Sequence, residues 1–166
     1  MSQLAESVLR NFPLKHLSWL SLYRANWLLP AKLGEEAAES IAEMKSLKVA
    51  DLRGVQIGLK NATALASLPK LEVLKISSNL ASDASIEKLS ESQSIQVLDI
   101  ANESKDSTVL SDAALVSLEK MMNLRELKLE KTGISRNAVD RYRRSKPQVE
   151  ISFTVADAGM DNHGGM

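Results

Sequence analysis

The chain of 166 residues contains no cysteine and few aromatic side chains, which make up 4% of the sequence. Without cysteine there can be no disulfide bond, no thiolate metal ligand and no cysteine nucleophile. The only two histidines, His16 and His163, lie near opposite ends of the sequence. A zinc site normally needs three or four ligands, and a serine triad needs a histidine beside a strained nucleophile turn. We therefore expect no enzymatic activity, no metal site and no cofactor.

The sequence also has no net charge and no long hydrophobic run. Lysine and arginine number 21, as do aspartate and glutamate, whereas proteins that bind nucleic acids usually carry a basic excess. The longest apolar runs, such as residues 27–30, are far shorter than the roughly 20 residues that span a bilayer. We expect a soluble, cytoplasmic protein with a protein partner, and neither nucleic acid nor membrane as partner. A targeting segment in residues 7–34, which lack acidic side chains, is the less favoured alternative.

An apolar spacing recurs five times along the chain. Each copy has an apolar residue, two variable residues, a second apolar residue, one variable residue and a third apolar residue. The copies are Leu17, Leu20 and Leu22; Leu47, Ala50 and Leu52; Leu71, Leu74 and Ile76; Ile95, Leu98 and Ile100; and Leu124, Leu127 and Leu129. A weaker sixth copy contains Val149 and Ile151. The alternation predicts strands with one buried face, which units of this size bury by stacking on their neighbours. We therefore predict an α/β solenoid with about six parallel strands on its concave face and helices on its convex face.

Helices are predicted between these strands, because the spacing of apolar residues changes there to the helical period. The predicted helical segments are 2–12, 34–44, 61–68, 82–90, 111–121 and 135–144. Ser82, Asp83, Ser111 and Ser135 are the expected N-caps. Two longer gaps between strands indicate insertions near residues 25–32 and 103–109.

The domain organisation follows from the extent of the repeats. Residues 1–152 are expected to form one domain, with repeats from about 14 to 151. The tail, residues 153–166, is expected to be disordered because few packing residues follow. Phe153 and Val155 leave open the alternative that the last strand continues into this tail.

The fifth unit carries the most specific pattern, LSDAALVSL over residues 110–118 and NLRELKLEKTGIS over residues 123–135. This pattern resembles the consensus of leucine-rich-repeat proteins of the bacterial, ribonuclease-inhibitor-like and F-box-associated classes. The resemblance extends from about residue 14 to 151 and implies the solenoid fold, but no particular function. Ala114 replaces a glycine often found near the helix start, and no F-box segment precedes the repeats. A role in ubiquitin ligation therefore lacks its sequence signature.

In a parallel stack, equivalent positions of successive units become neighbours about 4.8 Å apart on the concave face. The position between the last two apolar residues of each copy is occupied by Ser21, Asp51, Lys75, Asp99, Lys128 and Glu150. We favour a ladder of alternating charges that specifies register over a ligand site at this position. The variable position two residues earlier, which lies on the same face, is occupied by Trp19, Val49, Val73, Val97, Glu126 and Gln148. This row is either a set of good strand formers or an exposed contact stripe.

The position after the charged row adds Tyr23 and Arg53 in the first two units. Trp, Tyr and Arg are the residues most often found as binding hot spots. The predicted protein-binding residues are Trp19, Tyr23, Arg24, Val49, Arg53, Val73, Lys75, Val97 and Asp99. If the first strand instead turned Leu14, Leu17 and Trp19 inward, the tryptophan would belong to the core. We infer a non-catalytic protein–protein interaction module that binds through its concave strand face. The alternative is a structural subunit or assembly factor held in a larger complex through its ends and helices.

Overall fold

Strands and helices alternate along the part of the chain that the computed structural model describes. The described residues are 14–23, 31–35, 37–102 and 110–155. Six strands form one parallel sheet in the order β1-β3-β5-β6-β7-β8. Their bounds are Trp19–Ser21 (β1), Val49–Asp51 (β3), Val73–Ser77 (β5), Val97–Ala101 (β6), Glu126–Thr132 (β7) and Glu150–Val155 (β8). Two short strands, β2 (Ala31–Lys32) and β4 (Val55–Gln56), form a separate parallel pair.

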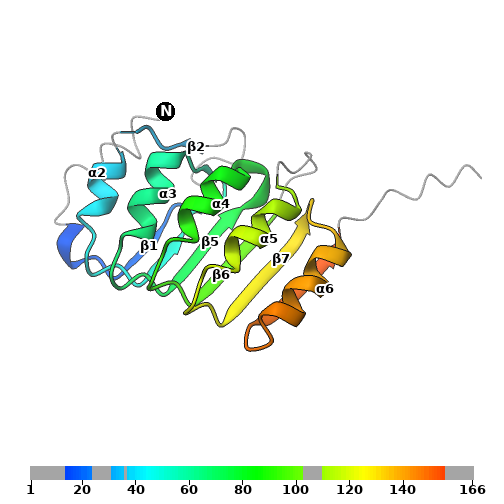
Figure 1. Ribbon diagram of the computed structural model, residues 1–166. Coiled ribbons are helices and arrows are strands. Elements are labelled where there is room, and N and C mark those ends of the chain that lie inside the picture. The colour runs from blue at the N-terminus through cyan, green and yellow to red at the C-terminus, as the bar shows by residue number, and fades with distance from the viewer. Residues whose placement is uncertain (1–13, 24–30, 36, 103–109, 156–166) are drawn as a thin grey trace, which may run out of the picture.

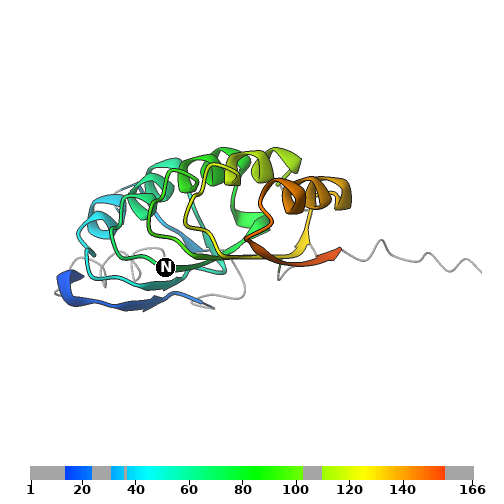
Figure 2. The same cartoon turned by 60° about the horizontal axis from the view of Figure 1, so that its bottom comes forward.

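Helices lie against one face of the six-stranded sheet. They are α2 (Ala37–Ala42), α3 (Leu59–Ala66), α4 (Asp83–Leu89), α5 (Asp112–Leu118) and α6 (Arg136–Ser145), with short 3-10 turns η1 (Leu14–His16) and η2 (Ser78–Leu80). The α-helices run side by side in chain order in Figure 1, and Figure 2 shows them on one side of the sheet. Among the described residues no α-helix covers the opposite face, which we call the open face.

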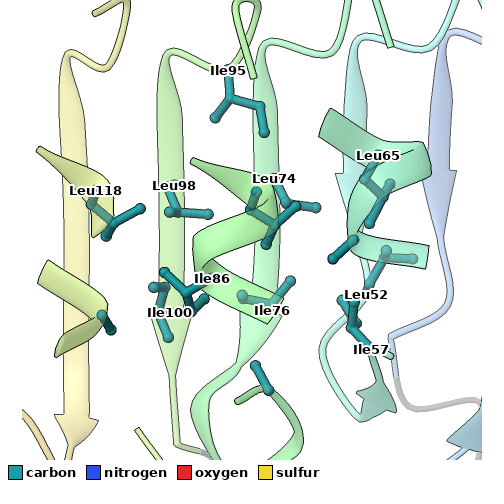
Figure 3. Close-up of a cluster of buried hydrophobic side chains, with 14 of the residues drawn as sticks. Leu52, Ile57, Leu65, Leu74, Ile76, Ile86, Ile95, Leu98, Ile100 and Leu118 are labelled. Atoms are coloured by element: carbon teal, nitrogen blue, oxygen red, sulfur yellow. The ribbon is translucent and has the colours of Figure 1, made fainter. Parts of the chain in front are cut away.

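The predicted leucine positions form the core between the sheet and the helices. Leu74, Leu98 and Leu127 are register neighbours in β5, β6 and β7, and each is 0% exposed. Ile86 of α4 and Leu118 of α5 meet the strand side chains from the helical side (Figure 3). Because side chains alternate along a strand, the intervening residues of each strand point to the open face. The predicted parallel sheet with helices on one face is confirmed.

Serine N-caps connect successive helices at the edge where the strands end. Ser82, Ser111 and Ser135 each accept a hydrogen bond from a main-chain N–H in the first turn, which confirms them as N-caps. Asp83 is not a cap as predicted, because it is the first residue of α4 and Ser82 caps that helix. The main-chain N–H and hydroxyl of Ser111 also donate to the Asp83 carboxylate of the preceding helix, at 2.9 and 2.5 Å. Ser135 donates to Asp112 in the same way, at 2.7 Å for both bonds. Each of these aspartates therefore ties its own helix to the cap of the next one.

We expect Asp112→Asn to lower the free energy of unfolding at pH 7 by about 1 kcal/mol, the net size of one hydrogen bond, because an amide has one acceptor oxygen for the two bonds from Ser135. Hydrogen bonds from Ser135, and to a smaller extent the charge of Arg141, hold the pKa of Asp112 below its ordinary value of 3.8. Because the folded-state pKa is the lower one, the carboxylate stabilises the fold above the unfolded-state pKa. That contribution is lost as the pH falls through the folded-state pKa. Urea unfolding at pH 7 and pH 3 should show a smaller difference from wild type at pH 3. Glu43→Gln, at an exposed carboxyl, is the control, and an equal loss in both variants would contradict the cap-to-aspartate link.

The first five units have the register predicted from the sequence. Trp19, Val49, Val73, Val97 and Glu126 are successive neighbours across β1, β3, β5, β6 and β7. Trp19 is 60% exposed. The alternative in which this tryptophan turns into the core is therefore wrong.

The pairing of the sixth unit with β7 is shifted by two residues from the prediction, so the first five residues of β7 have partners two residues later in the sequence than expected. Phe153 pairs with Leu129, so Glu150 lies beside Glu126 and not beside Lys128. A shift of two residues keeps the same set of side chains on the core face, so alternation alone does not detect it. Phe153 packs against the core and supplies the third apolar position of the unit.

The last strand also runs beyond the predicted domain limit. β8 continues to Val155, so the boundary placed between residues 152 and 153 falls inside this strand. The predicted helix 2–12, the insertion at 103–109 and residues 156–166 of the predicted tail lie outside the described residues.

Candidate functional site

A row of apolar side chains crosses the open face over four adjacent strands. It consists of Trp19, Val49, Val73 and Val97, and we call it the apolar row. The three valines are partly exposed, and Trp19 is the most exposed member. At about 4.8 Å between strands, the row extends for about 14 Å. A continuous apolar stripe that solvent reaches is typical of contact surfaces.

Arg53 joins Asp51 and Tyr23 at the end of the apolar row that contains Trp19. Its guanidinium bonds the Asp51 carboxylate through two nitrogens, Nε to Oδ1 at 2.9 Å and Nη2 to Oδ2 at 2.6 Å. The same guanidinium lies 4.3 Å from the centroid of the Tyr23 ring, a cation–π distance. Burial raises the pKa of Asp51, but hydrogen bonds from Arg53 and the charges of Arg53 and Lys75 outweigh it, and the pKa is lowered. The carboxylate therefore stays ionised and holds the Arg53 guanidinium against the face of the Tyr23 ring.

The predicted ladder of ion pairs between neighbouring strands does not form. Asp51 pairs with the arginine two residues later, and Lys128 pairs with Glu126 of its own strand at 3.1 Å. Lys75 and Asp99 are register neighbours, yet within the described part of the chain neither has an ion pair within 4.0 Å. Both side chains are partly buried. The centre of the open face therefore presents a cation and an anion that are not bound to each other.

Asp99 shows that charged side chains of β5, β6 and β7, together with Arg53 after β3, share one surface. Burial raises its pKa above the ordinary value of 3.8, and Glu130 adds a smaller rise, while Arg53, Lys75 and Lys128 oppose the change. The net shift is upward. These groups lie near enough to act on one carboxylate, so they belong to one electrostatic environment.

Acidic side chains on β7 and β8 extend this surface, and the sequence prediction did not include them in the site. They are Glu126, Glu130 and Glu150, of which Glu126 and Glu150 are register neighbours. Glu130 and Glu150 are exposed and form no ion pair within the described residues. The signal available in the sequence was Glu126 in the valine row. The two-residue shift of the last unit concealed only the position of Glu150, because the prediction placed Gln148 beside Glu126.

The predicted binding residues that the structure describes lie together. The residues on open-face strand positions are Trp19, Val49, Val73, Lys75, Val97 and Asp99. Tyr23 and Arg53 lie just after β1 and β3, in contact with each other. Arg24 lies outside the described residues.

A groove separate from the open-face row lies where the loops enter β5, β6 and β7. It is an open groove of about 350 Å³, lined by Pro69, Lys70, Glu72, Gln93, Ser94, Gln96, Asn123 and Arg125. Two of its polar side chains already serve the fold, since Ser94 donates to the Leu68 carbonyl and Asn123 to the Gln93 carbonyl, both at 2.6 Å. The groove lacks the aromatic and aliphatic side chains that the open face presents.

The described segments contain neither a metal-binding cluster nor a membrane-spanning helix. No three His, Asp or Glu side chains there are grouped so that they could hold a metal ion. No helix in these segments has the length and hydrophobicity needed to cross a membrane.

No protein-family model matches the chain, and no characterised protein matches its sequence. Among solved structures, the crystal structure of a TLR13–ssRNA13 complex contains a similar arrangement, with a TM-score of 0.56 at 19% identity. The likeness covers 84% of this chain and 19% of that leucine-rich-repeat chain. The fold is leucine-rich-repeat-like. At this identity the likeness concerns the fold alone, and the RNA is a component of that complex. The narrower bacterial, ribonuclease-inhibitor-like and F-box-associated classes have no matching family model.

Proposed function

We propose that this protein is a non-catalytic protein–protein interaction module that binds its partner through the open face. The observation that carries the proposal is the apolar row, which begins at a tryptophan that is 60% exposed. Tyr23 and Arg53 lie in contact at the same end of the face. These three residue types are the ones most enriched among binding hot spots, and exposed apolar stripes are typical of protein contacts.

The rigidity of the surface supports the same proposal. Each open-face residue alternates with a core residue of the same strand, and α-helices back the whole sheet. A surface that is ordered before binding loses little conformational entropy on association. We propose that the stacked units form a solenoid whose open face is its concave side, as in other repeat proteins that bind along one face.

The charges of the open face favour a protein partner over a nucleic acid. Carboxylates outnumber basic groups there: the carboxylates belong to Asp51, Asp99, Glu126, Glu130 and Glu150, and the cations to Arg53, Lys75 and Lys128. Binding to phosphates depends on an excess of basic side chains. An acidic excess would repel a phosphate backbone.

A second candidate function is a structural subunit held through its helices and ends. Exposed apolar side chains on that side favour it: Val116 of α5 is 63% exposed, and Met122, in the loop before β7, is 72% exposed. Leu59, at the start of α3, is 52% exposed. Leu59 and Val116 lie on helices that are separated by α4, whereas the open-face residues are register neighbours on adjacent strands.

The partner is identified by affinity capture from a lysate of the source cells, followed by mass spectrometry. The Kd of the complex is then measured for matched variants of this protein. We expect Trp19→Ala with Val73→Asp to weaken binding at least about 30-fold, the size of one hot-spot loss. Val116→Asp with Met122→Asp should leave the Kd within about twofold. Trp19→Ala alone, at a side chain outside the core, tests the proposal if the double variant unfolds. If the helix-side variant loses the partner and the open-face variants keep it, the second candidate function is correct.

A further inference from the structure

The open face is divided into two chemically different halves. On β1, β3, β5 and β6, the first outward position is always apolar, from Trp19 to Val97. On β7 and β8 no outward position is apolar. The outward residues there are Glu126, Lys128, Glu130, Glu150, Ser152 and Thr154. The row that begins at Trp19 therefore continues from Val97 directly into two glutamates.

Ion pairing leaves the two halves with different net charges. In the apolar half, Arg53 neutralises Asp51, while Lys75 and Asp99 carry opposite charges and form no ion pair within 4.0 Å among the described residues. In the acidic half, Lys128 neutralises only Glu126. Glu130 and Glu150 keep their charges unpaired within the same described segments. The apolar half is therefore neutral overall, and the acidic half is negative.

The register also places like charges together. Glu126 and Glu150 lie directly opposite each other on adjacent strands, an arrangement that destabilises a strand pair when no cation relieves it. Lys128 contacts Glu126, but Glu150 has no ion pair in the described part of the chain. A cation supplied by a ligand would relieve this repulsion only when the ligand is bound.

We propose that the open face binds a polypeptide segment whose apolar side chains are followed by lysine or arginine. The apolar part lies across Trp19, Val49, Val73 and Val97, and the basic part lies over Glu126 and Glu150. From β1 to β8 the row extends for about 24 Å, the length of about seven extended residues or about 16 helical residues. This inference rests on the proposed function, because it assigns the chemistry and the direction of the partner on the same face.

A display library of random 16-residue peptides tests the inference with the protein as it exists. We expect the enriched peptides to carry aliphatic or aromatic residues in one part and two or more Lys or Arg in the other. A synthetic peptide of the enriched sequence should bind the Glu126→Lys, Glu150→Lys double variant at least 10-fold more weakly than wild type. Its affinity for wild type should fall as salt is raised. The Glu126→Gln, Glu150→Gln variant, which changes little in size, replaces the lysine variant if that one unfolds, and its loss should be smaller but in the same direction.

Glu39→Lys with Glu43→Lys is the matched control, because it makes the same charge change at exposed positions of α2 and the residue that follows. This control should bind the peptide within twofold of wild type. Enriched peptides without basic residues, no enrichment at all, or equal losses in the two double-lysine variants would overturn the inference. If Trp19→Ala still abolishes capture of the natural partner in those cases, the proposed function stands and only the partner chemistry is wrong. If Trp19→Ala has no effect on capture either, both fail.

Discussion

Leu98→Ala is expected to lower the free energy of unfolding by about 3–4 kcal/mol, within the range for fully buried leucines. Leu98 is the second residue of β6, is 0% exposed, and has Leu74 and Leu127 as register neighbours on the two sides. Its removal leaves a cavity bounded by strands and helices that cannot collapse without disturbing both neighbouring units. Urea unfolding followed by circular dichroism measures the change.

Val97→Ala is the matched control for Leu98→Ala. Val97 is the adjacent residue on the same strand, but its side chain points to the open face and is partly exposed. Its truncation removes fewer buried methyl groups and leaves no enclosed cavity, so we expect a loss below about 1 kcal/mol. Equal losses for the two variants would show that β6 does not have the alternation on which the fold and the open face depend.

Tyr142→Ala is expected to lower the free energy of unfolding by about 3–4 kcal/mol, within the range for large-to-small core substitutions. Tyr142 is 1% exposed and is the one aromatic residue of α6, whose other residues are mostly charged. Its hydroxyl donates to the Leu118 carbonyl at 3.4 Å, a long hydrogen bond that contributes little. Most of the stabilisation therefore comes from burial of the ring, and Tyr142→Phe should cost less than about 1 kcal/mol.

Ultraviolet titration gives an independent check of the buried tyrosine. Burial, with a smaller effect from Glu119, raises the pKa of Tyr142 to about 12. The tyrosinate signal that titrates with this raised pKa should disappear in Tyr142→Phe. Titration of this group near its ordinary pKa of 10.0, or a Tyr142→Phe loss as large as that of Tyr142→Ala, would contradict the placement of the ring in the core.

The alternation of apolar residues was sufficient to predict the sheet and which residues share its open face. A period of two separates core from open-face residues, so the apolar row from Trp19 to Val97 follows from the leucine spacing alone. The contact between Tyr23 and Arg53 follows in the same way, because they are equivalent residues of adjacent units.

The ion pairs could not be predicted by the same means. Adjacent positions suggested cross-strand pairs such as Asp51 with Lys75, but Arg53 reaches back two residues and bonds the carboxylate at two points. A bidentate guanidinium contact is stronger than a point contact with an ammonium group, and side-chain length and geometry decide between them. Spacing in the sequence carries no information on that choice.

The position of Glu150 beside Glu126 was missed for a different reason. A shift of two residues in the last unit leaves every core-facing residue on the core face, so the alternation of apolar residues cannot reveal the shift. The packing of Phe153 against the core sets the observed register, and this brings Glu150 beside Glu126. The short pair of β2 and β4 was also missed, because two-residue strands carry too few residues for a periodic signal.

Hydroxyl-radical footprinting of the protein alone and in complex with its captured partner tests most directly whether the open face is the binding surface. The chain supplies natural reporters of the most reactive residue types: Trp19 and Tyr23 at the open face, and Met122 at the entrance to β7. If the partner binds the open face, oxidation of Trp19 and Tyr23 slows several-fold in the complex while oxidation of Met122 is unchanged. Protection of Met122 with no change at Trp19 would contradict binding through the open face.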